Sequence, residues 1–398
     1  MHDLELRVDD VAAGGDGIAR ADDGRVVFVH GGVPGDVVVA RVTKDQPRML
    51  KADLVAIRTP SSDRTTPPCR HVADGCGGCG WQHLTVDAQR RSKQRMAEEA
   101  LRRIGRQEGT VDLAAPLPDR GFRTSLRFLV TPDGPAFRGE RSHDAVPIAS
   151  CLIAHPGLDE LVRHGRFGIA TEVTLRIGGA TGERLAIVDP SVPADLELAD
   201  DVVVVGEDEL LGGASPSFHD EVAGRRFRIS ARSFFQTRTD GAEALVAEVR
   251  AAGGDAWGSG RLADLYGGVG LFASTLGAAM ATVLVESSRS SVADARHNLA
   301  DRTAEVVRCS VDRWRATPAD VVVADPPRSG LGKDGVAAVA GTGAGRVVLV
   351  SCDAAAFGRD AGLLAAAGYE RRSTSLVDLF PHTPRVELVS RFDKSGSR

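Results

Sequence analysis

The chain has 398 residues, of which 42% are hydrophobic and 26% are charged. This length favours two or three domains, and apolar runs such as Val202–Val205 and Val347–Val350 are only strand-sized, which excludes a membrane-spanning helix. The net charge of −5 excludes a protein that holds nucleic acid by bulk charge alone, although a local basic face can still bind phosphates.

The chain begins MHDLELRVDD, which is acidic and alternates polar with apolar residues. A secretory signal is basic and then apolar, so we expect a cytoplasmic protein that does not bind membranes and whose thiols stay reduced. The six cysteines are therefore candidates for metal binding or catalysis.

Residues 1–60 alternate apolar and polar positions in the runs LELRV, RVVFVH and DVVVARV. Turn pairs separate these runs at Gly14-Gly15, Gly31-Gly32 and Pro34-Gly35. The pattern predicts a small antiparallel β-barrel. The polar, proline-ended segment Ser61–Pro68 that follows predicts a domain boundary.

Cysteines cluster directly after this boundary. Cys69, Cys76 and Cys79 stand at C-x6-C-x2-C spacing, and Cys151 follows at a distance. Such thiols bind zinc or an iron–sulfur cluster, and the spacing alone makes zinc the default.

Residues 61–230 form the expected central domain. Between Arg90 and Arg106, basic and apolar residues are interleaved at helical spacing, which fits a solvated amphipathic helix and an RNA-contacting helix equally well. This helix, near residues 88–106, is also a candidate for packing on the C-terminal domain. Alternating patches such as SLRFLV, EVTLRI and ERLAIV then predict an α+β domain dominated by antiparallel strands.

Residues 231–398 have a different sequence pattern. Strand-like runs, ADLYG, TVLVE, VVVADPP and RVVLVSC, alternate with alanine-rich helical stretches such as GAEALVAEVRAAG. This is the pattern of a parallel sheet covered by helices, so the region is predicted to be a Rossmann-like α/β domain.

A glycine-rich turn, DLYGGVG, ends the first of these strands at Gly270, and Glu286 ends the next one. Glycines let the backbone approach a ligand, and a carboxylate at that place can bond both hydroxyls of a ribose. The pair predicts a nucleoside site, although a tight turn and a helix-capping glutamate remain the structural alternative. Because a G-x-G-x-x-G fingerprint is absent, adenosylmethionine fits better than NAD.

Two more polar positions follow strands of the same sheet. Asp325 stands before Pro326-Pro327, which stiffen the backbone, and Cys352 ends the strand RVVLVSC at a turn into a helix. Amides at such a turn favour a thiolate, so Cys352 is a candidate nucleophile, whereas Cys309 lacks any chemical context. Glu387 lies in the alternating run RVELVSRF, where apolar neighbours predict a raised pKa and a capacity to accept a proton.

Together, DLYGGVG, DPPRSGL, VSCD and FPHTPRVE closely resemble the RNA uracil-5-methyltransferase family, and the resemblance runs through nearly the whole chain. It implies an N-terminal OB-like TRAM barrel that binds RNA, an α+β central domain with an iron–sulfur cluster, and a class I, Rossmann-like methyltransferase domain in residues 231–398. The substrate implied is transfer or ribosomal RNA, with no obligate protein partner.

The resemblance also assigns roles. It makes Cys352 the nucleophile that adds to carbon 6 of uracil and Glu387 the base that removes the proton from carbon 5. The implied contacts to S-adenosyl-L-methionine are Gln236, Tyr266, Leu271, Glu286 and Asp325, and the implied ligands of a structural [4Fe-4S] cluster are Cys69, Cys76, Cys79 and Cys151.

Four positions depart from the family pattern. Leu271 stands where asparagine is common, Ala354 replaces a usual proline, Arg385 replaces a usual histidine, and six residues rather than five separate Cys69 from Cys76. Two competing hypotheses are a radical enzyme that cleaves adenosylmethionine at its cluster and a non-catalytic RNA-binding or folding protein. Neither needs Cys352, so a Cys352→Ala substitution separates them from the methyltransferase.

Overall fold

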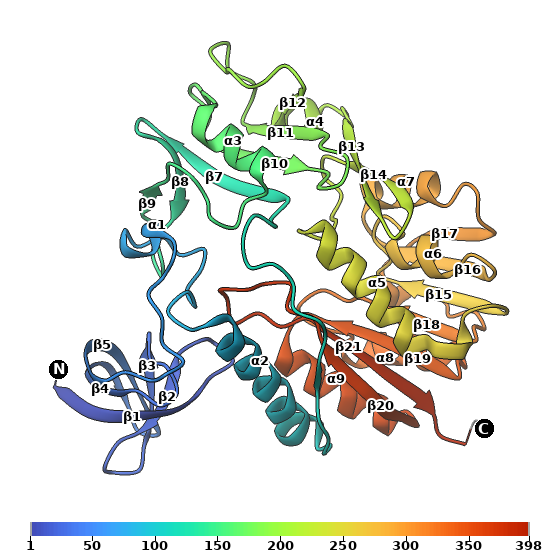
Figure 1. Ribbon diagram of the computed structural model, residues 1–398. Coiled ribbons are helices and arrows are strands. Elements are labelled where there is room, and N and C mark those ends of the chain that lie inside the picture. Colours follow the sequence, from blue (N-terminus) through green and yellow to red (C-terminus); the bar gives the residue numbers. More distant parts are fainter. Residues whose placement is uncertain (1, 397–398) are drawn as a thin grey trace.

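The computed structural model describes residues 2–396, which form a closed barrel, a six-stranded sheet, a two-stranded hairpin and an eight-stranded sheet (Figure 1). In the view of Figure 1 the barrel lies at the lower left, the six-stranded sheet above it, and the eight-stranded sheet with its helices to the right.

The barrel strands are β1 (Asp3–Val11), β2 (Gly17–Arg20), β3 (Val26–His30), β4 (Val37–Gln46) and β5 (Met49–Thr59). They close in the order β1-β2-β3-β5-β4. Alternate side chains such as Val27 and Val29 are fully buried, because successive residues of a strand face opposite sides. The predicted barrel is confirmed, except that β3 and β5 pair in parallel.

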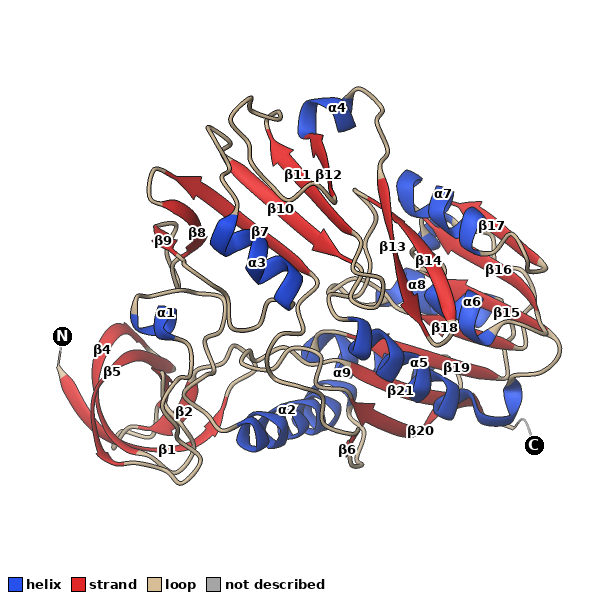
Figure 2. Cartoon of the chain, turned by 45° about the horizontal axis from the view of Figure 1, so that its top comes forward, coloured by secondary structure: helices blue, strands red, loops and turns tan. Residues whose placement is uncertain are grey.

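The segment that follows the barrel, residues 60–113, contacts the C-terminal domain. It contains α1 (Arg70–Ala73), α2 (Val86–Ala100), the π-helical turn η1 (Leu101–Gly105) and β6 (Asp112–Leu113). Helix α2 and η1 pack against α9 (Ala354–Ala366), and β6 pairs with β20 (Tyr369–Leu376), so that β6 forms one edge of the eight-stranded sheet. Figure 2 shows α2 lying between the barrel and this sheet.

The basic residues of α2 are mostly used within the protein. Arg91 pairs with Asp63 and Arg95 with Asp10, while Glu99 of α2 pairs with Arg102 of η1. Lys93 is fully buried rather than solvated. The helix is therefore not simply solvated: most of its charges are partnered, and it packs against α9 of the C-terminal domain, as the third expectation had it.

The central sheet is largely antiparallel, as predicted, with the order β12-β11-β10-β7-β8-β9. Its elements are β7 (Ser125–Thr131), β8 (Gly134–Arg138), β9 (Ala145–Pro147), α3 (Pro156–His164), β10 (Glu172–Ile177), β11 (Arg184–Asp189), β12 (Val202–Gly206) and α4 (Glu207–Leu211). The hairpin of β13 (Ser217–Val222) and β14 (Arg225–Ser230) leads to the next domain.

The C-terminal sheet has the strands β15 (Arg261–Leu265), β16 (Ala281–Glu286), β17 (Ala304–Arg308), β18 (Val321–Ala324), β19 (Arg346–Ser351), β20 (Tyr369–Leu376) and β21 (Leu388–Lys394). Their order is β17-β16-β15-β18-β19-β21-β20-β6. Strands β15 to β19 run parallel and β21 is antiparallel to its neighbours. The order reverses between β15 and β18, where open α/β sheets bind ligands.

Helices cover both faces of this sheet. They are α5 (Thr239–Gly253), η2 (Gly254–Ala256), α6 (Leu271–Leu276), α7 (Arg289–Asn298), η3 (Val311–Arg313), α8 (Gly332–Gly341) and α9. The apolar side chains of α5 and α6 pack on one face, and those of α2, α8 and α9 on the other. None of the helices within residues 2–396 is long and apolar enough to cross a membrane.

Candidate functional site

A hollow lies where the loop after β15 meets the loop after β18. It is lined by Gln236, Tyr266, Leu271 and Asp325 among others, and encloses about 350 Å³ including its opening. The structure therefore brings four of the five residues expected to contact the methyl donor around one hollow.

The glycine-rich turn needs left-handed backbone at Gly268 (φ 55°) and Gly270 (φ 93°), a region that glycine enters without strain. The fifth expected residue, Glu286, adjoins this turn. Its carboxylate accepts hydrogen bonds from the amide of Gly268 at 3.1 Å and from that of Ser288 at 2.7 Å. Because Ser288 caps α7, Glu286 both holds the turn and steadies the start of the next helix.

Asp264, at the end of β15, was not singled out by the sequence reasoning although it opens the DLYGGVG motif. It is fully buried, and one carboxylate oxygen accepts a hydrogen bond from the amide of Ala273 at 2.9 Å. The other oxygen has no partner within the described chain. Burial raises the pKa of Asp264 to about 7. Through its hydrogen bond to Ala273, the carboxyl group anchors α6 to the sheet.

Leu271, which stands where asparagine is common in the family, lines the hollow with an apolar side chain. The side chain is 7% exposed and belongs to the apolar cluster on the α5 face of the sheet. It therefore packs into the core below the hollow and offers shape rather than a polar contact.

A second pocket surrounds Cys352. Cys352 follows β19, and the next residue, Asp353, caps α9 by accepting a hydrogen bond from the amide of Ala356. The pocket encloses about 470 Å³ including its mouth and is also lined by Arg328 and Arg385. The predicted strand-to-helix turn is confirmed.

Burial opposes the thiolate that the amides at this turn were expected to favour. Burial raises the pKa of Cys352 to about 11, and the carboxyl groups of Glu387 and Asp325 act in the same direction. The positive charge of Arg328 opposes them only weakly. Burial and nearby carboxylates thus outweigh the helix-end amides, which the sequence pattern alone could not reveal.

Glu387 lies just before β21 and is 4% exposed. Burial, with the nearby charge of Asp325, raises the pKa of Glu387 well above its ordinary value, so the raised pKa expected from its apolar neighbours is confirmed. Burial also raises the pKa of Asp325 to about 7. Asp325 lines the hollow and lies near enough to Cys352 and Glu387 for its charge to act on both.

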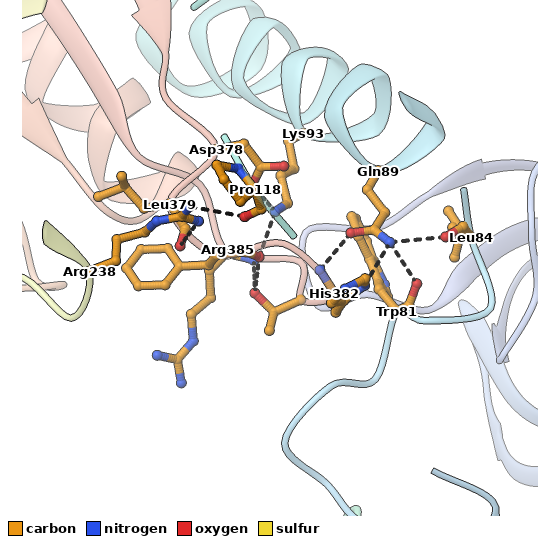
Figure 3. A network of polar contacts seen from close by, with 12 residues as sticks. Trp81, Leu84, Gln89, Lys93, Pro118, Arg238, Asp378, Leu379, His382 and Arg385 are labelled. Atoms are coloured by element: carbon orange, nitrogen blue, oxygen red, sulfur yellow. Dashed lines mark hydrogen bonds and ion pairs between the residues drawn. The ribbon is translucent and has the colours of Figure 1, made fainter. Parts of the chain in front are cut away.

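Buried polar contacts hold the turn that leads to Glu387 (Figure 3). Lys93 of α2 donates to the carboxylate of Asp378 at 2.6 Å and to the carbonyl of Phe380 at 2.8 Å. Gln89, one turn earlier, accepts a hydrogen bond from the amide of His382 at 2.6 Å. Sequence reasoning missed both residues, because a polar side chain on a basic helix gives no sign that it is buried.

Arg238 holds the same segment from the α5 side. Its guanidinium is fully buried, pairs with Asp240 at 2.7 Å, donates to the carbonyl of Pro118 at 2.9 Å and lies over the ring of Phe122. A more distant contact, at 3.5 Å, reaches the carbonyl of Leu379. Three segments far apart in the chain therefore fix the position of residues 378–387.

The four clustered cysteines lie apart from this site. Cys69, Cys76, Cys79 and Cys151 line one cavity of about 730 Å³ including its opening. Burial raises the pKa of Cys79 to about 12 and that of Cys151 to about 11. Among residues 2–396, no three His, Cys, Asp or Glu side chains converge closely enough to hold a single metal ion.

Cys309 packs at the edge of the apolar core on the α9 face, which agrees with the absence of chemical context around it in the sequence. The structure thus separates the cysteines into three groups. One is a nucleophile candidate, one is a core residue, and four surround a cavity in the central region.

Comparisons with known proteins agree with this architecture. Residues 3–55 match the model of the TRAM domain. An uncharacterized RNA methyltransferase of Streptomyces avermitilis is 36% identical, covering 98% of this chain and 97% of its own. Another, of Gloeobacter violaceus, is 35% identical and covers 97% of this chain and 95% of its own.

A solved structure shares the whole fold. Pyrococcus abyssi tRNA (uracil-54, C5)-methyltransferase in complex with S-adenosyl-L-homocysteine superposes with a TM-score of 0.75 and 22% identity, covering 98% of this chain and 100% of that chain. The predicted fold class, a Rossmann-like methyltransferase domain with an OB-like TRAM barrel and an α+β central domain, is confirmed. From its relatives along nearly its full length, the chain belongs to the RNA methyltransferase family.

Proposed function

We propose that this protein transfers a methyl group from S-adenosyl-L-methionine to carbon 5 of a uridine in RNA through a covalent bond to Cys352. The observation that carries the proposal is that Cys352 lines one cavity, Asp325 lines another, and the carboxyl groups of Glu387 and Asp325 lie near enough to the Cys352 thiol for their charges to act on it. The cavity lined by Asp325 would hold the nucleoside part of the methyl donor, and the cavity lined by Cys352 would hold the uracil base.

The chemistry requires a covalent step because carbon 5 of uracil is a poor nucleophile. The Cys352 thiol first loses its proton to solvent, and the thiolate adds to carbon 6, which places electron density on carbon 5. After carbon 5 has accepted the methyl group, the Glu387 carboxylate removes its proton. The bond between Cys352 and carbon 6 then breaks as the ring double bond returns.

The raised pKa of Glu387 suits this role, because a carboxylate that holds a proton tightly is a strong base once it is ionised. Arg328 and Arg385 line the pocket of Cys352, and their positive charges favour the thiolate as the substrate enters. The donor supplies an electrophilic methyl group when it is bound. We assign its binding to Gln236, Tyr266, Leu271, Glu286 and Asp325.

We assign RNA binding to the barrel and to the pocket arginines. A base stacked in RNA cannot present carbon 6 to a thiolate, so the target uridine must be flipped out at a cost of roughly a few kcal/mol. Arg328 and Arg385 have no hydrogen bond or ion pair through their side chains in the part of the chain described, which leaves both guanidinium groups available for phosphates. We propose transfer RNA or ribosomal RNA as the substrate, and we place the reaction in the cytoplasm.

The four cysteines fit a [4Fe-4S] cluster better than one zinc ion. They surround one cavity without converging on a point, as tetrahedral zinc with its bonds of about 2.3 Å requires. Backbone amides of Ile153 and Ala154 bond to the sulfur of Cys151, as amides commonly do around cluster sulfurs. Four thiolate ligands would give the cluster a structural role in the central domain, residues 61–230.

Iron and acid-labile sulfide measured in protein purified without air test the cluster. The expected result is that both are present and that a Cys79→Ser variant loses most of them, while Cys309→Ser, a cysteine outside the cavity, retains them. Absence of iron and sulfide from the parent protein would contradict the assignment without affecting the roles of Cys352 and Glu387.

Trapping with RNA that contains 5-fluorouridine tests the reaction. Fluorine at carbon 5 cannot leave as a proton, so the adduct persists and mass spectrometry should place it on Cys352. The Cys352→Ala variant should form none, and Cys309→Ala should react like the parent. If no covalent complex forms with the parent under turnover conditions, or if Cys352→Ala still methylates RNA, the proposed function is wrong.

A further inference from the structure

The turn between β1 and β2 of the barrel reaches the pocket of Cys352. Ala13, in this turn, lines that pocket together with Cys352, Arg385 and Pro384. Two backbone hydrogen bonds close the turn, from Ala12 to Asp16 and from Gly15 to Ala12, each 2.8 Å long. The pocket wall is therefore built partly by the domain at the other end of the chain.

Gly15 is the point of closest approach. A Cβ atom placed on it would lie 3.1 Å from Nε1 of Trp81 and 3.2 Å from Cγ of Pro384. Both distances are shorter than ordinary carbon contacts of about 3.5–4.0 Å. The barrel turn thus presses directly against the segment that carries Arg385 and leads to Glu387.

Hydrogen bonds continue from this contact toward the base. Trp81 Nε1 donates to the Gly15 carbonyl at 3.0 Å, and the Trp81 amide donates to the carbonyl of His382 at 2.9 Å. Gln89 donates to the Trp81 carbonyl at 3.0 Å and accepts from the amide of His382. The chain of contacts therefore joins the barrel turn to residue 382, five positions before Glu387.

The barrel is also packed into the same core as the catalytic domain. Val11 and Val33 of the barrel belong to one apolar cluster with Trp81, Val386 and Leu388. Burial of such side chains in a shared core resists relative movement of the two domains. The barrel turn is consequently held at a fixed place beside the pocket.

From these contacts we infer that the β1–β2 turn of the TRAM barrel, through Gly15 and Trp81, is a positioning element of the catalytic pocket and does more than bind RNA. It sets the place of the 381–386 turn and so of Arg385 and Glu387. The inference rests on the proposed function for its kinetic consequence, but the positional claim stands on the packing alone.

Matched glycine variants test it. Gly15 and Gly24 both lie in barrel turns at positive φ, 99° and 84°, but a Cβ atom at Gly24 would meet nothing within 4 Å. Gly15→Ala and Gly24→Ala therefore introduce similar backbone strain, and only the first pushes on Trp81 and Pro384. Trp81→Phe is a second route, because it keeps a ring but removes the hydrogen bond to Gly15.

The first readout is hydrogen exchange of the His382, Thr383, Arg385 and Val386 amides, which does not depend on activity. Gly15→Ala and Trp81→Phe should exchange the His382 amide about tenfold faster than the parent, since local opening becomes easier. Gly24→Ala should match the parent. Equal exchange in the Gly15→Ala and Gly24→Ala variants would overturn the inference, whether or not the parent forms an adduct.

The second readout is the rate of adduct formation at saturating 5-fluorouridine RNA. Displacing a catalytic group by a fraction of an ångström should slow Gly15→Ala about fivefold or more relative to Gly24→Ala, with similar RNA affinity. A loss of affinity with an unchanged saturated rate would show that the turn acts only in RNA binding and would also overturn the inference. A parent without adduct defeats the proposed function and leaves the exchange result to decide the positional claim.

Discussion

Replacing Lys93 with methionine tests how strongly α2 holds the turn before Glu387. The Lys93 side chain is 0% exposed and the side chain of Asp378 is 4% exposed, with 2.6 Å between Nζ and the carboxylate. Methionine fills nearly the same space as lysine, so the substitution leaves little empty volume and the destabilisation from a cavity is small. The main loss is that a carboxylate and the carbonyl of Phe380 remain buried without their donor.

Removing one partner of a buried ion pair costs about 3–5 kcal/mol. Protonation sets an independent upper limit on this loss, because a buried carboxylate without its partner can take up a proton. Protonating an ordinary aspartic acid at pH 7 costs about 4 kcal/mol, at about 1.4 kcal/mol for each pH unit above its pKa. The two figures agree, so we expect Lys93→Met to lower the free energy of unfolding by about 4 kcal/mol at pH 7.

Urea unfolding followed by tryptophan fluorescence measures this loss as a shift of the midpoint. Lys333→Met removes an exposed lysine and should change the unfolding free energy by less than about 0.5 kcal/mol. Adding Asp378→Asn to Lys93→Met removes the stranded charge and should restore about 2 kcal/mol. A Lys93→Met protein within about 1 kcal/mol of the parent would refute the argument, because the pair would then not be desolvated.

Three further predictions concern the reaction. Glu387→Gln should still form the bond between Cys352 and ordinary uridine RNA but fail to resolve it, so mass spectrometry should detect an accumulating methylated adduct; normal turnover would contradict the role of Glu387 as base. Burial raises the pKa of Cys352 to about 11, so its thiolate fraction should rise about tenfold per pH unit from pH 7 to 10. The rate of its alkylation by iodoacetamide in the RNA-free protein should rise in parallel, and a flat profile would be evidence against the buried thiol. Arg385→Gln should weaken RNA binding and reduce the slope of log affinity against log salt by about 1, whereas an unchanged slope would mean that Arg385 contacts no phosphate.

The local patterns of the sequence predicted much of the fold. Alternating runs gave the barrel strands, and apolar runs between alanine-rich stretches gave β15, β16, β18 and β19. These predictions succeed because side-chain periodicity in a strand depends only on the chain itself. Asp325 and Cys352 were expected at one edge of the sheet for a second reason. Each ends a strand, and parallel strands bring their carboxyl ends together.

Electrostatic properties could not be predicted in the same way. The sequence indicated a thiolate at Cys352, whereas the structure buries that thiol beside Glu387 and Asp325 and raises its pKa. The pKa of a group depends on its burial and on charges from other segments. Neither quantity is encoded within a few residues of the cysteine.

The sequence by itself determined which strands form and which reactive side chains end them. Tertiary structure alone decided that Lys93 and Gln89 would be buried against the turn before Glu387 and that Ala13 would line the pocket of Cys352. The physical reason is that strand and helix patterns arise from neighbouring residues, whereas burial, charge coupling and cavity walls arise only when segments far apart in the chain pack together.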